Sequence, residues 1–439
     1  MALFVWVVLQ CAAHYGFVLI FSLFACLLRL WGLAAGLTKR KRSQREREVV
    51  IVGGGFAGAY VAKALEDCFR VTLVDNKDYF EFTPSVLRTI VEPNHVNSIQ
   101  IRHREYLNLK RSRVVLDSVT DVRADHEIGF DYLVLCLGST YSTPFKASSV
   151  IISNRGETLS GCFQDLSAAE SVLIIGGGIV GVELAAEVAE HFPHKDIVLV
   201  HSGPHLMNGR GTVPPKASAY ARRWLESKGV RIMCNERVVE FGTKDCPRFV
   251  TDKGTTIEAS LAFLSTGIVP NSSFLRDGLL APYLDPKGFI MVNSHLQLRH
   301  HPNIFVCGDV IAVDEEKLAQ TAEKHAAIVA KNIHLLARTE DTGAATVAAS
   351  SKEKVDVDPT DAKLLGKAKD VEATSNKGDL IAATRPLGLA VYDPADLPIL
   401  ISLGKYAGAL TWRGWALTGF LPAVMKEFVE WKVMSAYRR

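Results

Sequence analysis

Two glycine-rich turns, each placed between an apolar strand and a helix, constrain this 439-residue chain more than any other feature. The first is Gly53-Gly54-Gly55-Phe56-Ala57-Gly58, which follows the apolar run 49–52 and precedes the helical pattern of 59–65. Such glycines permit a tight turn, close backbone approach to a pyrophosphate and close helix packing. The next apolar run ends at Asp75, 22 residues after the first glycine. A carboxylate at this place can accept a hydrogen bond from a ribose hydroxyl. This segment therefore predicts a dinucleotide-binding unit.

The second turn repeats the pattern 123 residues later as Gly176-Gly177-Gly178-Ile179-Val180-Gly181. It follows the strand pattern 171–175, and the helical pattern after it carries Glu183 and Glu187. The following strand ends at His201, where a strict NADH site favours an acid and a strict NADPH site an arginine. A surface histidine without a ligand role is the alternative. We expect NAD(P)H here, held by Gly176, Gly178, Gly181, Glu183 and His201, with the choice between NADH and NADPH open.

Three further strand patterns indicate an α/β flavin domain that is interrupted by the nicotinamide domain. The pattern 132–139 ends in the turn at Gly138, which we expect at the FAD, and 261–267 ends at Gly267, which we expect at NAD(P)H. The third, 303–309, delivers Asp309 at its carboxyl end, which faces the ligand crevice in an open α/β sheet. Asp309 is therefore expected to bind the flavin ribitol, and a plain strand-end aspartate is the alternative.

The amino-terminal segment has the pattern of a membrane anchor. Residues 3–28 carry no fixed charge, and 26 residues exceed the roughly 20 that a spanning helix needs. A basic run at 39–48 follows, so the positive-inside rule places the catalytic body on the cytosolic side. A buried core helix or an apolar targeting segment are the alternatives. The choice between a span and a hairpin stays open, as does the organelle, whether endoplasmic reticulum, lipid droplet or mitochondrial outer membrane.

Charge and cysteine spacing exclude several classes of function. The net charge of +3 is too weak for nucleic acid to be a main partner. None of the eight cysteines lies closer than twelve positions to the next, which excludes local zinc and CxxC redox sites. We expect no metal and mostly reduced thiols.

Taken together, the motifs resemble the flavoproteins with two dinucleotide-binding domains, which include glutathione reductase relatives and type II NADH dehydrogenases. The chain is most similar to the mitochondrion-associated apoptosis-inducing-factor branch, the ferroptosis-suppressor-protein-like oxidoreductases. The resemblance covers about residues 49–334 and 385–432 and is carried by six stretches: 49–58, 79–88, 176–187, 198–202, 265–267 and 401–405. It implies FAD contacts by Gly53 to Ala57, Arg88, Val119 and Asp309.

The resemblance also implies a domain order and a reaction. The expected segments are a membrane anchor (1–38), a basic juxtamembrane segment (39–48), FAD-binding parts (49–150 and 267–337), an NAD(P)H-binding domain (151–266), a flexible insertion (338–380) and a membrane- and quinone-facing region (381–439). The expected activity is that of an FAD-dependent NAD(P)H dehydrogenase that reduces a lipid-soluble quinone. A redox sensor of apoptosis-inducing-factor type, with little turnover, is the rival.

A helix near Lys317 supplies the candidate catalytic residues. Type II NADH dehydrogenases carry Ala-Gln-x-Ala-x-Gln at their quinone pocket, and this chain keeps the first glutamine as Gln320 but has Lys324 at the second. The residues expected on the quinone and flavin side are Lys317, Gln320, Thr321 and His325. The positive amino terminus of this helix would stabilise the anionic reduced flavin. A plain amphipathic packing helix is the alternative.

Disulfide reductases of this fold place a cysteine pair against the flavin, but this chain has no cysteine between Cys68 and Cys136. We therefore expect electrons to leave the flavin directly for a diffusible acceptor. A sulfide–quinone reductase needs cysteines beside the flavin, and only Cys162 and Cys307 are candidates.

The carboxyl-terminal residues 399–439 hold seven aromatic side chains, among them Trp412, Trp415 and Trp431, and six Lys or Arg against two Glu. Trp and Tyr with basic residues favour a membrane–water interface. Ordinary packing onto the flavin domain is the alternative.

Overall fold

The computed structural model describes residues 47–122, 128–141, 146, 151–207, 211–243, 246–341, 388–394 and 396–438. The predicted anchor, most of the juxtamembrane segment and most of the predicted insertion lie outside these residues. Within them, no helix combines the length and the apolar character that a membrane crossing requires.

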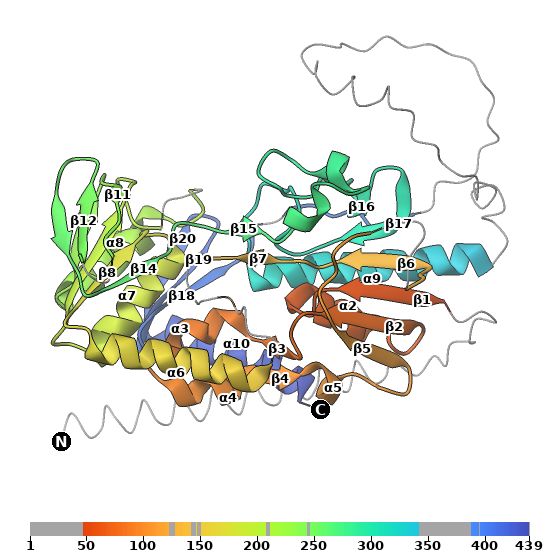
Figure 1. Ribbon diagram of the computed structural model, residues 1–439, viewed down its shortest axis with the longest axis horizontal. Helices are drawn as coiled ribbons and strands as arrows, with labels where there is room; N and C mark the ends of the chain where they lie inside the picture. The colour runs from red at the N-terminus through yellow and green to blue at the C-terminus, as the bar shows by residue number, and fades with distance from the viewer. Residues whose placement is uncertain are drawn as a thin grey trace, which may run out of the picture. The chain divides into compact units, whose positions relative to one another are not determined.

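The first sheet is built from the two parts of the chain expected to bind FAD (Figure 1). Its strands, in spatial order, are β16 (Gln297–Leu298), β17 (His301–Val306), β6 (Tyr132–Leu135), β1 (Glu48–Val52), β2 (Arg70–Asp75) and β5 (Ser112–Leu116). All neighbours are parallel except β16 and β17. The central strands are buried runs of Val, Ile and Leu, as expected for a sheet covered on both faces. Helices α2 (Phe56–Leu65) and α9 (Ala319–Asp341) pack together against it.

The second sheet is fully parallel, in the order β10 (Arg231–Cys234), β9 (Asp196–His201), β8 (Ser171–Ile175) and β14 (Leu261–Leu264). Its helices are α7 (Ile179–His191) and α8 (Pro215–Ser227). A small antiparallel sheet of β11 (Val238–Glu240), β12 (Arg248–Thr251) and β13 (Thr256–Glu258) follows β10.

The carboxyl-terminal region forms an antiparallel sheet and a helix. The strands are β18 (Ile399–Leu403), β19 (Ala407–Trp412) and β20 (Trp415–Gly419), and the helix is α10 (Phe420–Tyr437). In Figure 1, β18 lies beside α7, and the Ser402 backbone N–H donates to Glu183 on that helix at 2.8 Å. The region therefore packs on the second dinucleotide unit.

The remaining elements are short, apart from α6. They are β3 (Tyr79–Glu81), η1 (Thr83–Ser85), α3 (Val86–Thr89), η2 (Pro93–His95), α4 (Val96–Ile99), β4 (Gln100–Arg102), α5 (His103–Tyr106), β7 (Ser139–Thr140), α6 (Ile152–Ala168), β15 (Val269–Pro270), η3 (Ser273–Leu275) and η4 (Ala281–Tyr283).

The α/β class with two dinucleotide-binding units is thus confirmed. One boundary differs from the expectation, because residues 338–341 continue α9 instead of beginning the insertion. Ile333 and Ala337 are still buried, so the helix keeps an apolar face against the sheet up to this point. The other domain boundaries stay predictions.

Candidate functional site

The two glycine turns have the same local geometry. Gly53 and Gly176 adopt φ of +98° and +112°, a region open mainly to glycine. The Gly53 N–H donates to Val74 C=O at 2.7 Å, and the Gly176 N–H to Val200 C=O at 2.8 Å. A side chain at either glycine would collide with backbone, since its Cβ would lie 2.3 Å from Cys136 O or 2.4 Å from Ser265 O. Each turn therefore makes close contacts with the carboxyl ends of two neighbouring strands.

The third glycine of each turn, in contrast, has free space around it. Gly55 and Gly178 are the amino-terminal caps of α2 and α7, and no side chain caps either helix. A Cβ at either position would meet no atom within 4 Å. Both glycines line one cavity of about 980 Å³. Backbone N–H groups that have no side-chain cap at a helix start attract phosphate oxygens, so the cradle fits the pyrophosphate of a dinucleotide.

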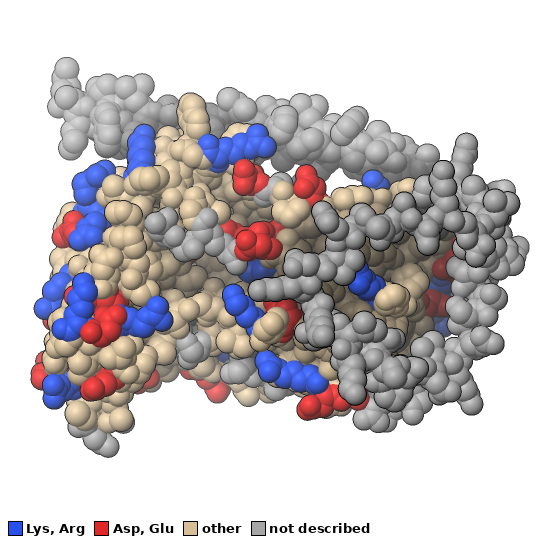
Figure 2. Space-filling view, turned by 90° about the horizontal axis from the view of Figure 1, so that it is seen from above, with Lys and Arg blue, Asp and Glu red and all other residues tan. Residues whose placement is uncertain are grey.

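Most of the residues expected to bind FAD line this cavity. They are Gly53, Gly54, Gly55, Phe56, Ala57, Asp75, Val119, Gly138 and Asp309. Gly178, Glu183 and Gly267 line it from the nicotinamide side, and Lys317 lies on its wall. One face of the described chain is hollowed, with acidic and basic side chains around the hollow (Figure 2).

Asp75 is held in an ionised form beside the first turn. Its Oδ2 accepts the Gly54 N–H at 2.6 Å and lies 3.3 Å from His103 Nε2. Burial opposes ionisation, but Lys77, His103 and the Gly54 N–H together lower the pKa of the Asp75 carboxyl below its usual value. A buried carboxylate at the end of β2 suits a ribose of FAD.

Asp309 is the second buried carboxylate of the cavity. Its Oδ2 accepts the Ser139 hydroxyl at 2.6 Å and the Lys146 ammonium at 2.7 Å. Burial opposes ionisation here too, yet Lys146 and Ser139 lower the pKa of the Asp309 carboxyl. With the open glycine cradle and Asp75, this acceptor makes the described residues a fitting FAD site.

The ion pair of Glu183 borders the cavity on its other side. Glu183 Oε1 accepts the Lys426 ammonium at 2.6 Å and the Ser402 N–H at 2.8 Å. Lys426 on α10 also lines the cavity. The pair therefore fastens the carboxyl-terminal sheet and helix to α7 at the cavity wall.

Several predicted site residues lie away from the cavity wall. They are Gly58, Arg88, Gly176, Gly181, His201, Gln320, Thr321 and His325. Gly58 and Gly181 still shape the turns, because a Cβ there would lie 1.7 Å or 1.9 Å from the carbonyl oxygen of Gly53 or Gly176. The ligand roles given to the other residues stay predictions.

Arg88 lies in a partly buried charge cluster and does not line the cavity. Its guanidinium lies 3.9 Å from Glu187 Oε1 and pairs with Glu427 on α10. Burial raises the pKa of the Glu187 carboxyl and outweighs the lowering influence of nearby Arg88, Lys426 and His191. The cluster joins α3, α7 and α10.

His325, expected on the quinone side, is fully buried under the Gly308 turn. Its Nδ1 accepts the Gly308 N–H at 3.2 Å, and its Nε2 lies 2.8 Å from Glu315 Oε1. The ring of Tyr392 meets it edge to face at 4.3 Å between centroids. His325 therefore supports the turn that carries Asp309. Gln320 donates a hydrogen bond to Pro398 C=O, and Thr321 donates one to Glu316 C=O. Both side chains are therefore hydrogen-bonded within the protein.

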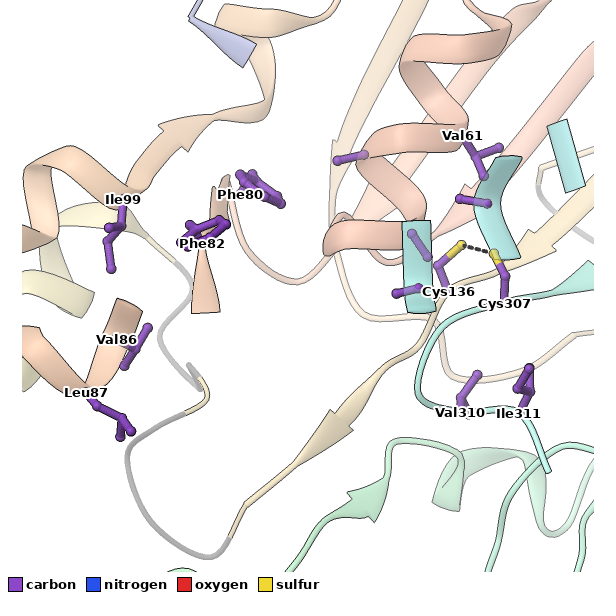
Figure 3. Close-up of a cluster of buried hydrophobic side chains, with 14 of the residues drawn as sticks. Val61, Phe80, Phe82, Val86, Leu87, Ile99, Cys136, Cys307, Val310 and Ile311 are labelled. Carbon is purple, nitrogen blue, oxygen red and sulfur yellow. Dashed lines mark hydrogen bonds between the residues drawn. The ribbon is translucent and has the colours of Figure 1, made fainter. Parts of the chain in front are cut away.

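Two cysteines far apart in sequence meet beneath the first turn. Cys136 Sγ and Cys307 Sγ lie 3.4 Å apart at the ends of β6 and β17 (Figure 3). Both are free thiols in an apolar cluster that includes Val61 and Ile311. Burial and the neighbouring Cys307 raise the pKa of the Cys136 thiol well above its usual value, which disfavours a reactive thiolate. Cys162, the other candidate, is half-buried on α6.

Sequence reasoning missed Ser139, Lys146 and Lys426 at the cavity. Ser139 directly follows Gly138, so its place in the tight turn was the available signal. Lys146 and Lys426 stand in no motif, and only the folded chain brings them to Asp309 and Glu183.

Comparison with known proteins gives consistent matches. Residues 47–326 match the model of the pyridine nucleotide-disulphide oxidoreductase family. Apoptosis-inducing factor homolog B of Dictyostelium discoideum is 30% identical over 331 residues, which are 67% of this chain and 83% of that protein. Ferroptosis suppressor protein 1 of Homo sapiens is 31% identical over 299 residues, 65% of this chain and 79% of that protein. The resemblance inferred from the motifs is confirmed.

A solved structure extends the match in fold. NDH2 from Plasmodium falciparum in complex with NADH aligns with a TM-score of 0.61 at 16% identity. The alignment covers 90% of this chain and 96% of that one. At this identity the likeness concerns the fold.

We predict that Gly55→Val yields a folded protein without FAD. A Cβ at this position meets no atom within 4 Å, so we expect the fold to survive, but the side chain would occupy the place of the pyrophosphate. The visible flavin spectrum of the purified protein, together with its thermal melting, measures both effects.

Gly178→Val is the matched control, because its side chain is equally unhindered at the second turn. It should keep FAD and lose flavin reduction by NAD(P)H. A full flavin spectrum in Gly55→Val would contradict the assignment of the first turn, and FAD loss in Gly178→Val alone would show the two sites to be reversed.

Proposed function

The chain belongs to the pyridine nucleotide-disulphide oxidoreductase family, and on this basis we propose that it passes electrons from NAD(P)H through FAD to a lipid-soluble quinone at a membrane. As a member of the family, it binds FAD as cofactor and uses a nicotinamide nucleotide. The proposal adds the acceptor and the membrane.

One observation carries the proposal: both dinucleotide turns open into the same cavity. Gly55 and Gly178 line it from opposite units, so a flavin on the first turn and a nicotinamide on the second can meet there. When bound, FAD would supply the hydride acceptance and the onward electron transfer to an acceptor. The chain's own task is to bring the two rings together, which requires positioning more than an acid or base.

Named residues account for that positioning. Asp75 and Asp309 offer ionised acceptors to the hydroxyls of the flavin nucleotide. Glu183 and Lys426 fix α7 to α10, so the second turn keeps its place relative to the cavity. The start of α9 and Lys317 bring positive potential to the cavity wall.

The thiols favour an acceptor other than a protein disulfide. Cys136 borders the cavity, but its sulfur faces Cys307 in an apolar cluster and its pKa is raised by burial. A buried thiol without thiolate character is a poor relay for electrons. This supports direct transfer from the flavin to a diffusible acceptor.

The carboxyl-terminal sheet supports an acceptor that resides in lipid. Ile399 and Leu400 on β18 line the cavity. The hairpin of β19 and β20 in the same sheet exposes Trp412 by 50% and Trp415 by 82%, and α10 exposes Trp431 by 57%. Exposed tryptophans beside the basic Arg413 suit a membrane–water interface. One sheet would thus connect the cavity to the membrane surface.

The location is proposed from sequence. The uncharged segment 3–28, followed by the basic run 39–48, supports a membrane anchor with the catalytic body facing the cytosol. Neither the organelle nor the choice between span and hairpin is part of the proposal.

We expect NADH or NADPH, added without oxygen, to bleach the flavin of the purified holoprotein, and a quinone added afterwards to restore the colour. Repeated cycles would establish turnover. Bleaching that persists after quinone addition would contradict a quinone reductase and favour a redox sensor with little turnover.

Removing residues 1–38 should release the protein from membranes while leaving the reduction of a soluble quinone analogue largely intact. Flotation with lipid vesicles and steady-state turnover measure the two properties on the truncated and the full chain. Loss of folding on truncation would mean that the segment belongs to the core.

Replacing Trp412 and Trp415 together by Ser should slow transfer to a long-chain quinone in liposomes more than transfer to a short soluble one, because the interfacial rings are lost. Flavin reduction by NAD(P)H should be nearly unchanged. Phe241→Ser, at a residue that is 52% exposed beyond β11, is the control and should affect neither acceptor. Equal loss with both quinones would show that these tryptophans only pack the fold.

A further inference from the structure

His103 and Tyr106 lie behind Asp75, which they connect to the protein core. His103 is fully buried, and neither residue is among the described residues on the cavity wall, whereas Asp75 lines it. The His103 Nε2 lies 3.3 Å from Asp75 Oδ2, and its Nδ1 lies 2.9 Å from the Tyr106 hydroxyl. His103 and Tyr106 begin and end α5, and a spacing of three residues places both side chains on one face of this helical turn.

The charge of Asp75 fixes the direction of these hydrogen bonds. The pKa of the Asp75 carboxyl is lowered in spite of its burial, and an ionised carboxylate only accepts hydrogen bonds. The His103 Nε2 must therefore carry the proton that it shares with Oδ2. Burial raises the pKa of the Tyr106 hydroxyl well above its usual value, so the phenol keeps its proton and can donate it to Nδ1 of a neutral ring.

Three protein donors hold the Asp75 carboxylate in one orientation. Oδ2 accepts the Gly54 N–H at 2.6 Å and the His103 Nε2–H, and Oδ1 accepts the Lys77 N–H at 3.1 Å. A carboxylate has about four acceptor sites, so one site on Oδ1 stays open for a ribose hydroxyl. Without His103, Oδ2 loses one of its two donors, and the carboxylate can turn more freely about its last bond.

Packing on both sides fixes the place of the His103 ring. A Cβ on Gly54 would lie 2.4 Å from His103 Cε1, so the ring lies directly against the middle glycine of the first turn. The backbone N–H of His103 donates to Asp78 C=O at 3.0 Å. Beyond the ring, Tyr106 meets Tyr437 of α10 edge to face, with 5.0 Å between the ring centroids. The ring is thus held between the first turn and the hydroxyl of a packed tyrosine.

We propose that His103, supported by Tyr106, is a positioning residue of the FAD site: its Nε2–H orients Asp75 so that the carboxylate accepts the hydroxyls of the adenosine ribose. The inference deepens the proposed function at this one site and rests on the assignment of FAD to the first turn. It does not depend on the acceptor or on membrane attachment.

The test measures how strongly the protein prefers FAD over a FAD analogue that contains 2′,3′-dideoxyadenosine and therefore lacks both hydroxyls of this ribose. The full-length holoprotein is equilibrated with an equal mixture of the two flavins, and the bound flavins are then released and quantified by chromatography. A merely structural defect weakens both flavins alike and leaves their ratio of affinities unchanged. A defect in ribose recognition lowers this ratio.

We expect the unmodified protein to prefer FAD at least about tenfold, because the hydroxyls bind a charged acceptor. In His103→Leu, which has a similar volume and no donor, this preference should fall at least about threefold. His103→Gln keeps a donor for Asp75 and an acceptor for Tyr106, so it should restore the preference to within about twofold of the unmodified protein.

Tyr132 supplies a matched control for Tyr106. Both tyrosines are buried, and each hydroxyl has a hydrogen-bond partner at 2.9 Å, His103 Nδ1 for Tyr106 and Glu340 Oε1 for Tyr132. Only Tyr106 leads to Asp75. Tyr106→Phe should therefore lower the preference for FAD about twofold to threefold, whereas Tyr132→Phe should leave it unchanged.

An unchanged preference in His103→Leu would overturn the inference, as would equal preferences in His103→Leu and His103→Gln. A ratio near one in the unmodified protein would show that Asp75 does not read the ribose and would overturn it too. If His103→Leu retains no flavin, the two Phe variants decide, because each loses a single oxygen atom, and an equal effect of both would contradict the proposal. Failure of quinone reduction would contradict the proposed acceptor and leave the flavin ratio measurable.

Discussion

The architecture depends on the contact between each glycine turn and the end of the neighbouring strand. Gly53 and Gly176 press against the carbonyl oxygens of Cys136 and Ser265, at distances that a side chain would make impossible. These contacts draw the start of α2 or α7 onto the carboxyl ends of a parallel sheet. The N–H groups without a side-chain cap then face a common cavity, and a phosphate can supply what the chain itself does not.

Buried and partly buried charges connect the elements around this cavity. Glu183 on α7 binds Lys426 on α10 and the backbone of β18, while Arg88 on α3 lies between Glu187 and Glu427. Ion pairs of this kind add little net stability, but removing one partner leaves a charge unsolvated and is costly. The geometry of these ion pairs therefore helps to specify how the carboxyl-terminal sheet packs on the second unit. The same sheet exposes the tryptophans for which we propose contact with lipid.

Much of this could be predicted from the sequence where the signal is local. The glycine turns, Asp75 and the strand leading to Asp309 lie in short contiguous patterns, and the structure brings all of them to one cavity. The partners of these residues are not local: Lys146 reaches Asp309 across 163 positions, and Cys136 meets Cys307 across 171. His325 shows a second non-local feature: a resemblance in the helix motif placed it on the quinone and flavin side, and the structure shows that its ring is buried beneath Gly308.

The two turns also show that different side chains can meet the same backbone requirement. The turn needs an acceptor for the N–H of its middle glycine, and a carboxylate and an imidazole both provide one. The first unit has Asp75 next to Lys77 and His103, whereas the second has the His201 imidazole, whose pKa is lowered by burial, with Ser202 beside it. A single chain thus carries two copies of one backbone turn, and a different side chain accepts the N–H of the middle glycine in each.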